Sequence, residues 1–309
     1  MHKADDKNDL VSVVIGCYNQ APFLSEAIES CLKQSHPHVE VVVVDDGSTD
    51  ETRQVVQDFA DVLYVYQDNQ GVSTARNRGL RESRAAYVIF LDGDDRLLPD
   101  AIECGLERFR ADSSIGCAVG RYRKINTEGS PLGPPNKICG NEDFYGALLK
   151  SNVIGMLGTM LFRRTALDKI GGFDRRFRAS EDYDVALRIA REYRVLEHEH
   201  LVAEYRWHDR NMSLDYCFLL KDVLGALKAQ WPYARTNAVY KEAFWVGRAN
   251  WRRLYSSLLF SSVIKETKRK GFHLKPLQQV IQMTASDPAT IPLFAARAWE
   301  WLRPSRSAS

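Results

Sequence analysis

Two groups of acidic residues stand directly after apolar runs, at the points where buried strands are expected to end. Asp46 follows the run 39–44, and Asp92 and Asp94 follow the run 86–91. Acidic side chains beside a diphosphate require a divalent cation between them, and Mg²⁺ and Mn²⁺ favour carboxylate, water and phosphate oxygens. The pattern therefore suits a nucleoside diphosphate ligand that is held through Mn²⁺ or Mg²⁺.

Both groups also have a structural interpretation. Asp94 or Asp95 could cap a helix that begins near Pro99, and Ser48 with Glu51 three residues later is a capping-box pattern. A helix cap does not need two consecutive acids before a glycine. We therefore expect only part of the first acidic group to serve as a cap.

The elements around these acids alternate between strands and helices. Buried strands are expected at 10–16, 39–44, 62–66 and 86–91, with helices at 21–34, 51–59, 73–82 and 99–111. This order predicts an α/β fold with a mostly parallel sheet flanked by helices, in which ligands bind beyond the carboxyl ends of the strands. Both acidic groups fall at such ends.

The pattern and the charge change near residue 215. Residues 216–309 contain 15 Lys/Arg against 5 Asp/Glu, a net charge of +10, whereas the residues before them contain 27 against 35, a net charge of −8. Long helical stretches are expected at 216–230, 238–264 and 275–284. We predict a catalytic domain over 1–215 and a basic helical segment over 216–309 for packing, homo-oligomerisation or contact with a membrane surface.

Several classes of protein are excluded by what the sequence lacks. It has no secretory signal and no apolar run of the ~18–20 residues that a membrane-spanning helix needs, and its six cysteines are scattered. A cytoplasmic protein with reduced thiols is expected. No Gly-rich phosphate loop follows the first strand, which argues against a dinucleotide oxidoreductase and a nucleotidyltransferase. No nucleic-acid-binding module accompanies the basic segment.

Five motifs occur in a specific order over roughly residues 10–215. They are Val13-Val14-Ile15 with Tyr18-Asn19, Asp45-Asp46-Gly47-Ser48-Thr49-Asp50, Gly71 with Ala75-Arg76-Asn77-x-Gly79, Leu91-Asp92-Gly93-Asp94-Asp95, and Glu181-Asp182-Tyr183-Asp184. Together they resemble the family 2 glycosyltransferases, which are inverting enzymes with the GT-A fold. Each motif alone is weak evidence, but the ordered set is specific.

The resemblance implies a nucleotide site at the ends of the first strands. Cys17, Tyr18 and Asn19 would line the nucleotide pocket, and Tyr18 would stack on the base. Asp46 would bind the base, and Arg76 would help to hold the base or the diphosphate. For Arg76 the alternative is an ordinary arginine on a helix surface.

The resemblance also implies a metal and a general base. Asp92 would contact the ribose or the sugar, and Asp94 would coordinate Mn²⁺ or Mg²⁺ between the phosphates. His208 stands where many relatives have a histidine near the metal, although a lone loop histidine usually faces solvent. Asp182 matches the family's general base, and its alternative role is to complement the dipole of a helix N-terminus.

Three further residues are expected near the donor or the acceptor. Glu181 and Asp184 would orient the base or the donor. Gly158 lies in the segment 155–159, which resembles an acceptor-side or donor-sugar loop of the family.

The implied reaction moves a single sugar, with a UDP-sugar as the expected donor, to a hydroxyl of a glycan or a lipid-linked acceptor. Processive members carry Gln-x-x-Arg-Trp, and here Ala203 replaces the glutamine before Arg206-Trp207. The chain is expected in the cytoplasm, where the inner face of the membrane would be its site of peripheral contact. The alternative is an inactive partner subunit that binds sugar nucleotides.

Overall fold

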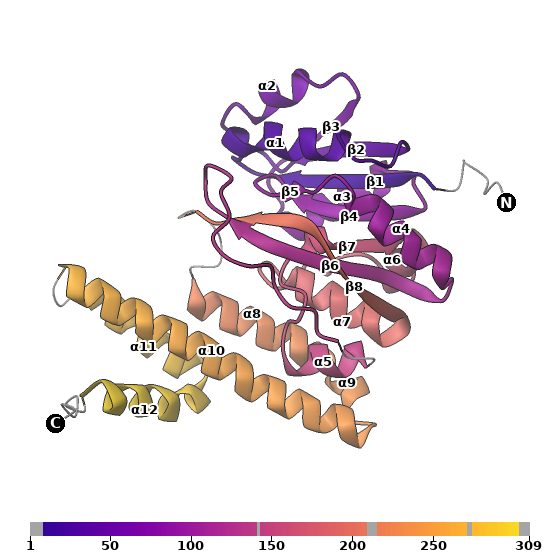
Figure 1. Cartoon of the computed structure of the whole chain (residues 1–309). Helices are drawn as coiled ribbons and strands as arrows, with labels where there is room; N and C mark the ends of the chain where they lie inside the picture. Colours follow the sequence, from indigo (N-terminus) through magenta and orange to yellow (C-terminus); the bar gives the residue numbers. More distant parts are fainter. Residues whose placement is uncertain (1–8, 141–142, 209–214, 271–273, 303–309) are drawn as a thin grey trace, which may run out of the picture. The chain divides into compact units, whose positions relative to one another are not determined.

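A computed structural model describes residues 9–140, 143–208, 215–270 and 274–302. The chain forms two compact units, of which the first contains residues 1–148 and 152–211 and the second contains residues 149–151 and 212–309 (Figure 1). The division falls a few residues before the boundary predicted near 215. The short segment 149–151 joins the second unit, which the sequence did not indicate.

The first unit is built on one eight-stranded sheet in the order β3-β2-β1-β4-β7-β6-β8-β5. The strands are β1 (Val11–Cys17), β2 (Val39–Asp45), β3 (Val62–Tyr66), β4 (Tyr87–Asp92), β5 (Arg96–Leu97), β6 (Ile115–Ile125), β7 (Met160–Arg163) and β8 (Arg194–Arg206). β1 pairs in parallel with β2 and β4, β2 with β3, and β6 with β8. β7 runs antiparallel between β4 and β6, and β5 runs antiparallel to β8. The predicted α/β fold with a mostly parallel sheet is therefore confirmed.

The register of the parallel strands brings the acidic groups to one edge of the sheet. Cys17 at the end of β1 lies opposite Asp45, and Gly16 lies opposite Asp92. Both acidic groups thus follow strands that end at the same level, as expected for a parallel sheet.

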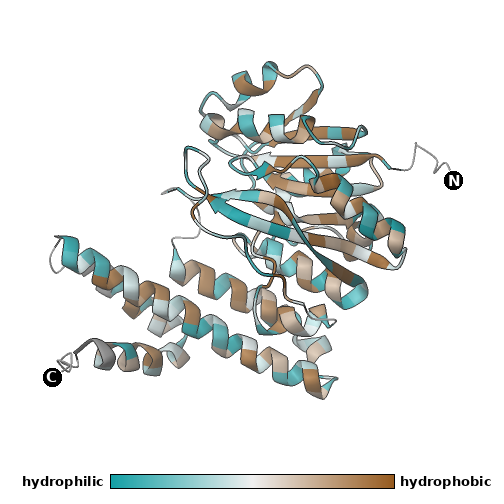
Figure 2. Cartoon of the chain, viewed as in Figure 1, coloured by the Kyte–Doolittle hydropathy of each residue, from teal (hydrophilic) through white to brown (hydrophobic). Residues whose placement is uncertain are grey.

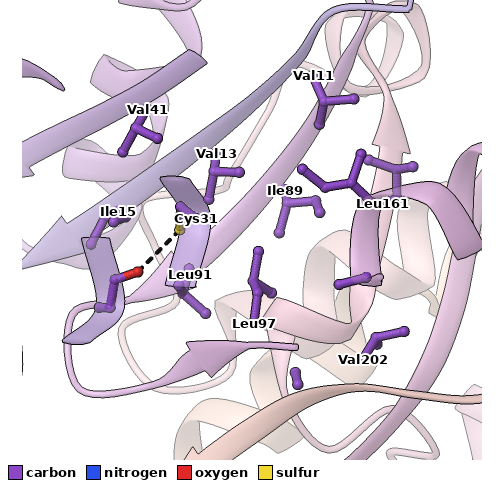
Figure 3. Packing of buried hydrophobic residues seen from close by; sticks show 14 of the residues in the cluster. Val11, Val13, Ile15, Cys31, Val41, Ile89, Leu91, Leu97, Leu161 and Val202 are labelled. Atoms are coloured by element: carbon purple, nitrogen blue, oxygen red, sulfur yellow. Dashed lines mark hydrogen bonds between the residues drawn. The ribbon is translucent and has the colours of Figure 1, made fainter. Parts of the chain in front are cut away.

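Helices cover both faces of this sheet. They are α1 (Ala21–Leu32), α2 (Thr52–Gln57), α3 (Val72–Glu82), α4 (Ala101–Ala111), α6 (Arg164–Ile170) and α7 (Glu181–Glu192). The short helix α5 (Phe144–Lys150) crosses the division between the two units. On one face α1 and α4 pack their apolar residues against alternate side chains of the strands, including Val13, Ile15, Ile89 and Leu91 (Figure 3). Mostly hydrophobic residues run along β1, as a strand buried on both faces requires (Figure 2).

The opposite face receives α3 at very short range. Gly79 of α3 faces Val14 and Val44, and a Cβ atom at this position would collide with Val14. The glycine in the third motif therefore lets the helix backbone lie directly against β1 and β2.

The two helix caps proposed for the acidic groups are wrong. α2 begins at Thr52, and Ser48 Oγ instead accepts a hydrogen bond from the Asn19 N–H at 2.9 Å. α4 begins at Ala101 after Asp100, so Asp94 and Asp95 lie outside its first turn. The acidic side chains at the strand ends are therefore not explained by capping of α2 or α4.

The second unit consists of helices. They are α8 (Tyr216–Ala229), α9 (Trp231–Ala234), α10 (Ala238–Lys270), α11 (Leu274–Ser286) and α12 (Ile291–Leu302), with a 3₁₀ turn at Pro288–Thr290. The three predicted helical stretches are confirmed, whereas α12 was not predicted. Among the described residues no helix combines the length and the apolar character needed to cross a membrane.

Candidate active site

Arg76 is the central buried cation of the site. It lies on α3 and is 3% exposed, and its two terminal nitrogens donate to Glu181 Oε1 and Asp92 Oδ1, each at 2.6 Å. It thereby joins the end of β4 to the start of α7. The interpretation of Arg76 as a surface residue is wrong. Because both terminal nitrogens are already engaged, the predicted contact with base or diphosphate would have to use the remaining Nε or displace one of the two carboxylates.

Asp182 is the half-buried acid beside this cation, in the first turn of α7. Its Oδ1 accepts a hydrogen bond from the Tyr183 N–H at 2.6 Å. Burial, and then the charge of Glu181, raise the pKa of Asp182 to about 7, against the opposing effects of the Tyr183 N–H and Arg76. A carboxyl group with this pKa can hold or release a proton near neutral pH, which suits a general base.

Glu181 leaves part of its carboxylate without a partner. The side chain is 6% exposed, and its Oε2 has no hydrogen-bond partner among the residues that the structure describes. The Nε of Arg76 is likewise buried and has no hydrogen-bond partner among the described residues. Two buried polar atoms without partners, on two paired side chains, indicate that this network is built to receive further polar groups.

Asp94 and His208 are in direct contact. The Nε2 of His208 lies 2.9 Å from Asp94 Oδ2, and its ring stacks on Phe23 with centroids 5.3 Å apart. Burial and the charge of Asp92 raise the pKa of Asp94, while His208 opposes the shift. The structure therefore brings together the two residues that were predicted as metal ligands.

This donor set suits a cation that is shared with a bound diphosphate. Within the described ranges no group of three or more His, Cys, Asp or Glu side chains could hold a metal by itself. A carboxylate and an imidazole leave most of the six coordination positions of Mg²⁺ or Mn²⁺ to phosphate oxygens and water. Asp94 and His208 would hold the ion only weakly without the nucleotide.

Gly93 allows the loop between Asp92 and Asp94 to lie close to the end of β1. Its backbone has no positive φ, so the expected tight turn is not the reason for a glycine. A Cβ atom here would lie 2.8 Å from Gln20 Oε1 and 3.0 Å from Cys17 Cβ. Close packing against the β1 loop is the constraint.

Arg206 holds the loop that contains Asp94 and Asp95 in place. From the sequence it was not identified as a site residue. It is 0% exposed, its backbone N–H donates to Asp95 Oδ1 at 2.8 Å, and its Nε donates to the Asp94 carbonyl at 2.9 Å. Its other nitrogens bond Glu26 and the Thr127 carbonyl, each at 2.7 Å. The sequence offered two signals, namely the position of this arginine two residues before His208 and its place in the incomplete Gln-x-x-Arg-Trp motif.

The loops after β1 and β2 are joined through Asn19. This residue has a φ of 54°, a conformation that asparagine tolerates better than most residues. Its Oδ1 accepts from the Thr49 N–H at 2.8 Å, and Asp50 Oδ2 accepts from the Ala21 N–H at 3.1 Å. Tyr18 beside it is 49% exposed, as an aromatic side chain that stacks on a base must be.

Asp46 organises the loop that leads into α3. Its Oδ1 accepts from Gln67 Nε2 at 2.7 Å and from the Gln70 N–H at 2.9 Å, and its Oδ2 accepts from the Gly71 N–H at 2.8 Å. The side chain is 4% exposed. Three bonds within the protein give Asp46 a positioning role that the base-binding prediction did not include.

Three other predicted site residues lie inside the protein. Cys17 belongs to the core, and its thiol, whose pKa is raised by burial, faces the Val44 carbonyl at 3.6 Å. Asp184 is 1% exposed and pairs with Arg188, which in turn bonds the Ile170 carbonyl at 2.9 Å. Asp184 thus joins α7 to α6, and its predicted role in orienting the base or the donor stays a prediction. Gly158 packs against Leu91 behind the end of β4.

Comparison with known proteins identifies the family. The profile described as "Glycosyl transferase family 2" matches residues 12–171, and one described as "Glycosyltransferase like family 2" matches residues 143–243. This chain belongs to glycosyl transferase family 2. The first match contains β1, β2, β4 and α3, and therefore every acidic group at the strand ends.

Two curated relatives illustrate the similarity. A chondroitin synthase of Escherichia coli is 33% identical over 59% of this chain and 26% of its own length. The putative teichuronic acid biosynthesis glycosyltransferase TuaG of Bacillus subtilis is 34% identical over 50% of this chain and 62% of its own length. The chain thus spans only part of the length of these relatives.

Solved structures share the fold over most of the chain. Residues 1–349 of TarS from S. aureus, solved with UDP, have a TM-score of 0.61 at 20% identity, and the match covers 92% of this chain and 81% of those TarS residues. The mannosyltransferase PcManGT from Pyrobaculum calidifontis, with GDP-Man and Mn²⁺, has a TM-score of 0.61 at 20% identity, covering 94% of this chain and 82% of its own. The predicted GT-A architecture is therefore confirmed.

Proposed function

We propose that this chain is an inverting glycosyltransferase that moves one sugar from a nucleoside diphosphate-sugar to a hydroxyl group of a glycan or a lipid-linked acceptor. The observation that carries the proposal is the half-buried Asp182, with its pKa near 7, joined through Glu181 and Arg76 to Asp92 at the end of β4. A general base and a donor-side carboxylate are thus held in one network.

In the proposed reaction the acceptor oxygen attacks the anomeric carbon from the face opposite the diphosphate. The bond between that carbon and the diphosphate oxygen breaks, and the nucleoside diphosphate leaves with the electron pair. Asp182 takes the proton of the acceptor hydroxyl, so the charges balance. Asp94 and His208 would hold Mn²⁺ or Mg²⁺, which neutralises charge on the diphosphate.

Several findings support the choice of substrates. TarS was solved with UDP and PcManGT with GDP-Man and Mn²⁺, and we favour a UDP-sugar for this chain. The names of the two curated relatives, a chondroitin synthase and a teichuronic acid enzyme, favour a glycan acceptor. We place the enzyme in the cytoplasm, where a lipid-linked acceptor would be met at the inner membrane face.

The test is a panel of UDP-, GDP- and dTDP-sugars offered to the purified protein with Mn²⁺. Slow hydrolysis of one member is expected. Asp94→Ala should abolish metal-dependent donor binding, whereas Asp182→Asn should retain donor binding and lose turnover. Arg84→Gln, on an exposed side chain that lies away from these residues, is the control.

The outcome also separates the alternative. A wild-type protein that binds one donor in calorimetry yet neither hydrolyses nor transfers it would be an inactive sugar-nucleotide-binding partner subunit. Failure of every donor to bind would contradict both interpretations.

A further inference from the structure

The outer side of α12 carries apolar residues in solvent. Its inner side packs through Phe294, which is 8% exposed, whereas Ile291 is 53% and Trp299 is 62% exposed. Residues four apart on a helix lie above one another, so the exposed apolar positions form a continuous line. We call Ile291, Pro292, Ala295, Ala296 and Trp299 the α12 stripe; all five are exposed. A tryptophan and an isoleucine that are each more than half exposed on one helix face indicate a contact surface.

The helix that packs against α12 is strongly basic. α10 carries eight Lys/Arg and two Asp/Glu over its 33 residues, a net charge of +6. Arg297 of α12 donates to Ser257 Oγ of α10 at 2.8 Å, which fixes the two helices to each other. Lys265, Lys268 and Arg269 are exposed in the last turns of α10. Figure 1 shows the C-terminal ends of both helices at the same end of this unit.

We propose that the α12 stripe binds the surface of an anionic lipid membrane. An apolar helix face with a tryptophan, beside a cluster of cations, is the combination that lies in the interface between headgroups and acyl chains. The cations of α10 would interact with the negative headgroups while Ile291 and Trp299 enter the apolar boundary.

A second copy of the chain fits this surface less well. The five residues of the stripe are far fewer than the roughly 20–30 residues per partner of a stable protein interface. Pairing two copies through α12 would also bring two basic α10 helices together, which like charges oppose. An anionic membrane supplies the complementary charge.

The test measures binding of the full chain to vesicles, without donor or metal. Binding to phosphatidylcholine vesicles that contain phosphatidylglycerol is expected, with at least about tenfold weaker binding to phosphatidylcholine alone and a loss at high salt. Trp299→Glu should weaken binding by about tenfold or more. The matched control is Val239→Glu on α10, because Val239 is equally exposed at 62% and the charge change is the same.

Two further measurements keep the proposal falsifiable. Lys268→Gln with Arg269→Gln should weaken vesicle binding while leaving donor hydrolysis in solution unchanged, so failure of the proposed activity and failure of the membrane contact are separable. If Trp299→Glu and Val239→Glu weaken binding equally, the stripe is not the contact. A dimer in light scattering that Trp299→Glu dissociates would overturn the proposal in favour of a second copy.

Discussion

Asp182 holds its proton unusually tightly for an aspartic acid, and this has a cost in stability. The pKa is about 7 in the folded chain against 3.8 for an ordinary aspartic acid. Between these values the unfolded chain binds fewer protons than the folded chain, so stability falls as the pH rises from about 4 to 7. Above pH 7 the whole penalty is present.

Asp182→Asn is therefore expected to raise the melting temperature at pH 8 and to leave it unchanged near pH 3.5. Thermal unfolding followed by circular dichroism across this range measures the effect. In the wild type, the turnover that depends on the base should rise through pH 7 as the carboxyl group ionises. A melting temperature that is equally higher at both pH values would contradict a titration of Asp182.

Arg76 stabilises two acidic side chains at once. Arg76→Met would leave Glu181 and Asp92 without their shared cation, and removing one member of a buried ion pair costs about 3–5 kcal/mol. Urea unfolding should show this loss of free energy of unfolding. The same change at Arg78, on the same helix but paired with Glu82 at the surface, should cost no more than about 1 kcal/mol. Equal effects at the two positions would contradict the buried network.

At the scale of the elements, the packing of α3 depends on one missing side chain. Gly79→Ala puts a methyl group into Val14, and such overpacking costs about 1–3 kcal/mol even though alanine favours a helix by about 1 kcal/mol. Gly133→Ala, where nothing lies within 4 Å of the added carbon, is the control and should change stability by less than about 0.5 kcal/mol. A Gly79→Ala variant as stable as the wild type would mean that α3 can move away from the sheet.

The sequence predicted the parallel half of the sheet because its strands are continuous apolar runs that end in polar residues. β8 has no such run, since it carries charged residues such as Glu197 and Glu199. The order of β7, β6 and β8 in the sheet follows from contacts between residues far apart in the chain. The site was predicted as a list of residues at strand ends, and Asp94 with His208 was among them.

The sequence did not reveal which acidic side chains already form hydrogen bonds or ion pairs within the protein. Asp46 and Asp184 look like free carboxylates in a motif, yet their partners are a backbone loop and Arg188. Arg206 looked like part of a motif that is incomplete here, and only its hydrogen bonds in the structure show that it supports Asp94 and Asp95. Burial and pairing are three-dimensional properties that spacing alone does not encode.

At the scale of the whole molecule, the charge is divided unevenly along the chain. The net charge of +2 is the difference between a segment at +10 and the rest at −8. Retention by a cation exchanger depends on local charge, so the protein should be retained at pH 8, close to its isoelectric point of about 8.1. Lys268→Gln with Arg269→Gln should elute at lower salt than Arg84→Gln with Arg53→Gln. The same elution salt for both pairs would mean that the net charge alone matters.

The segment 149–151 has a consequence for biosynthesis. It belongs to the second unit, where Gly247 makes room for the Leu149 backbone and Asn250 Nδ2 donates to the Lys150 carbonyl at 3.1 Å. Both partners are translated on the order of 100 residues later, which at the usual rate of synthesis is on the order of 5–20 s. A ribosome that stops at residue 211 releases a catalytic unit in which these three residues have lost their neighbours. A truncated gene that encodes only the first unit would therefore remove contacts in the middle of the remaining chain, at residues 149–151, and not only at its end.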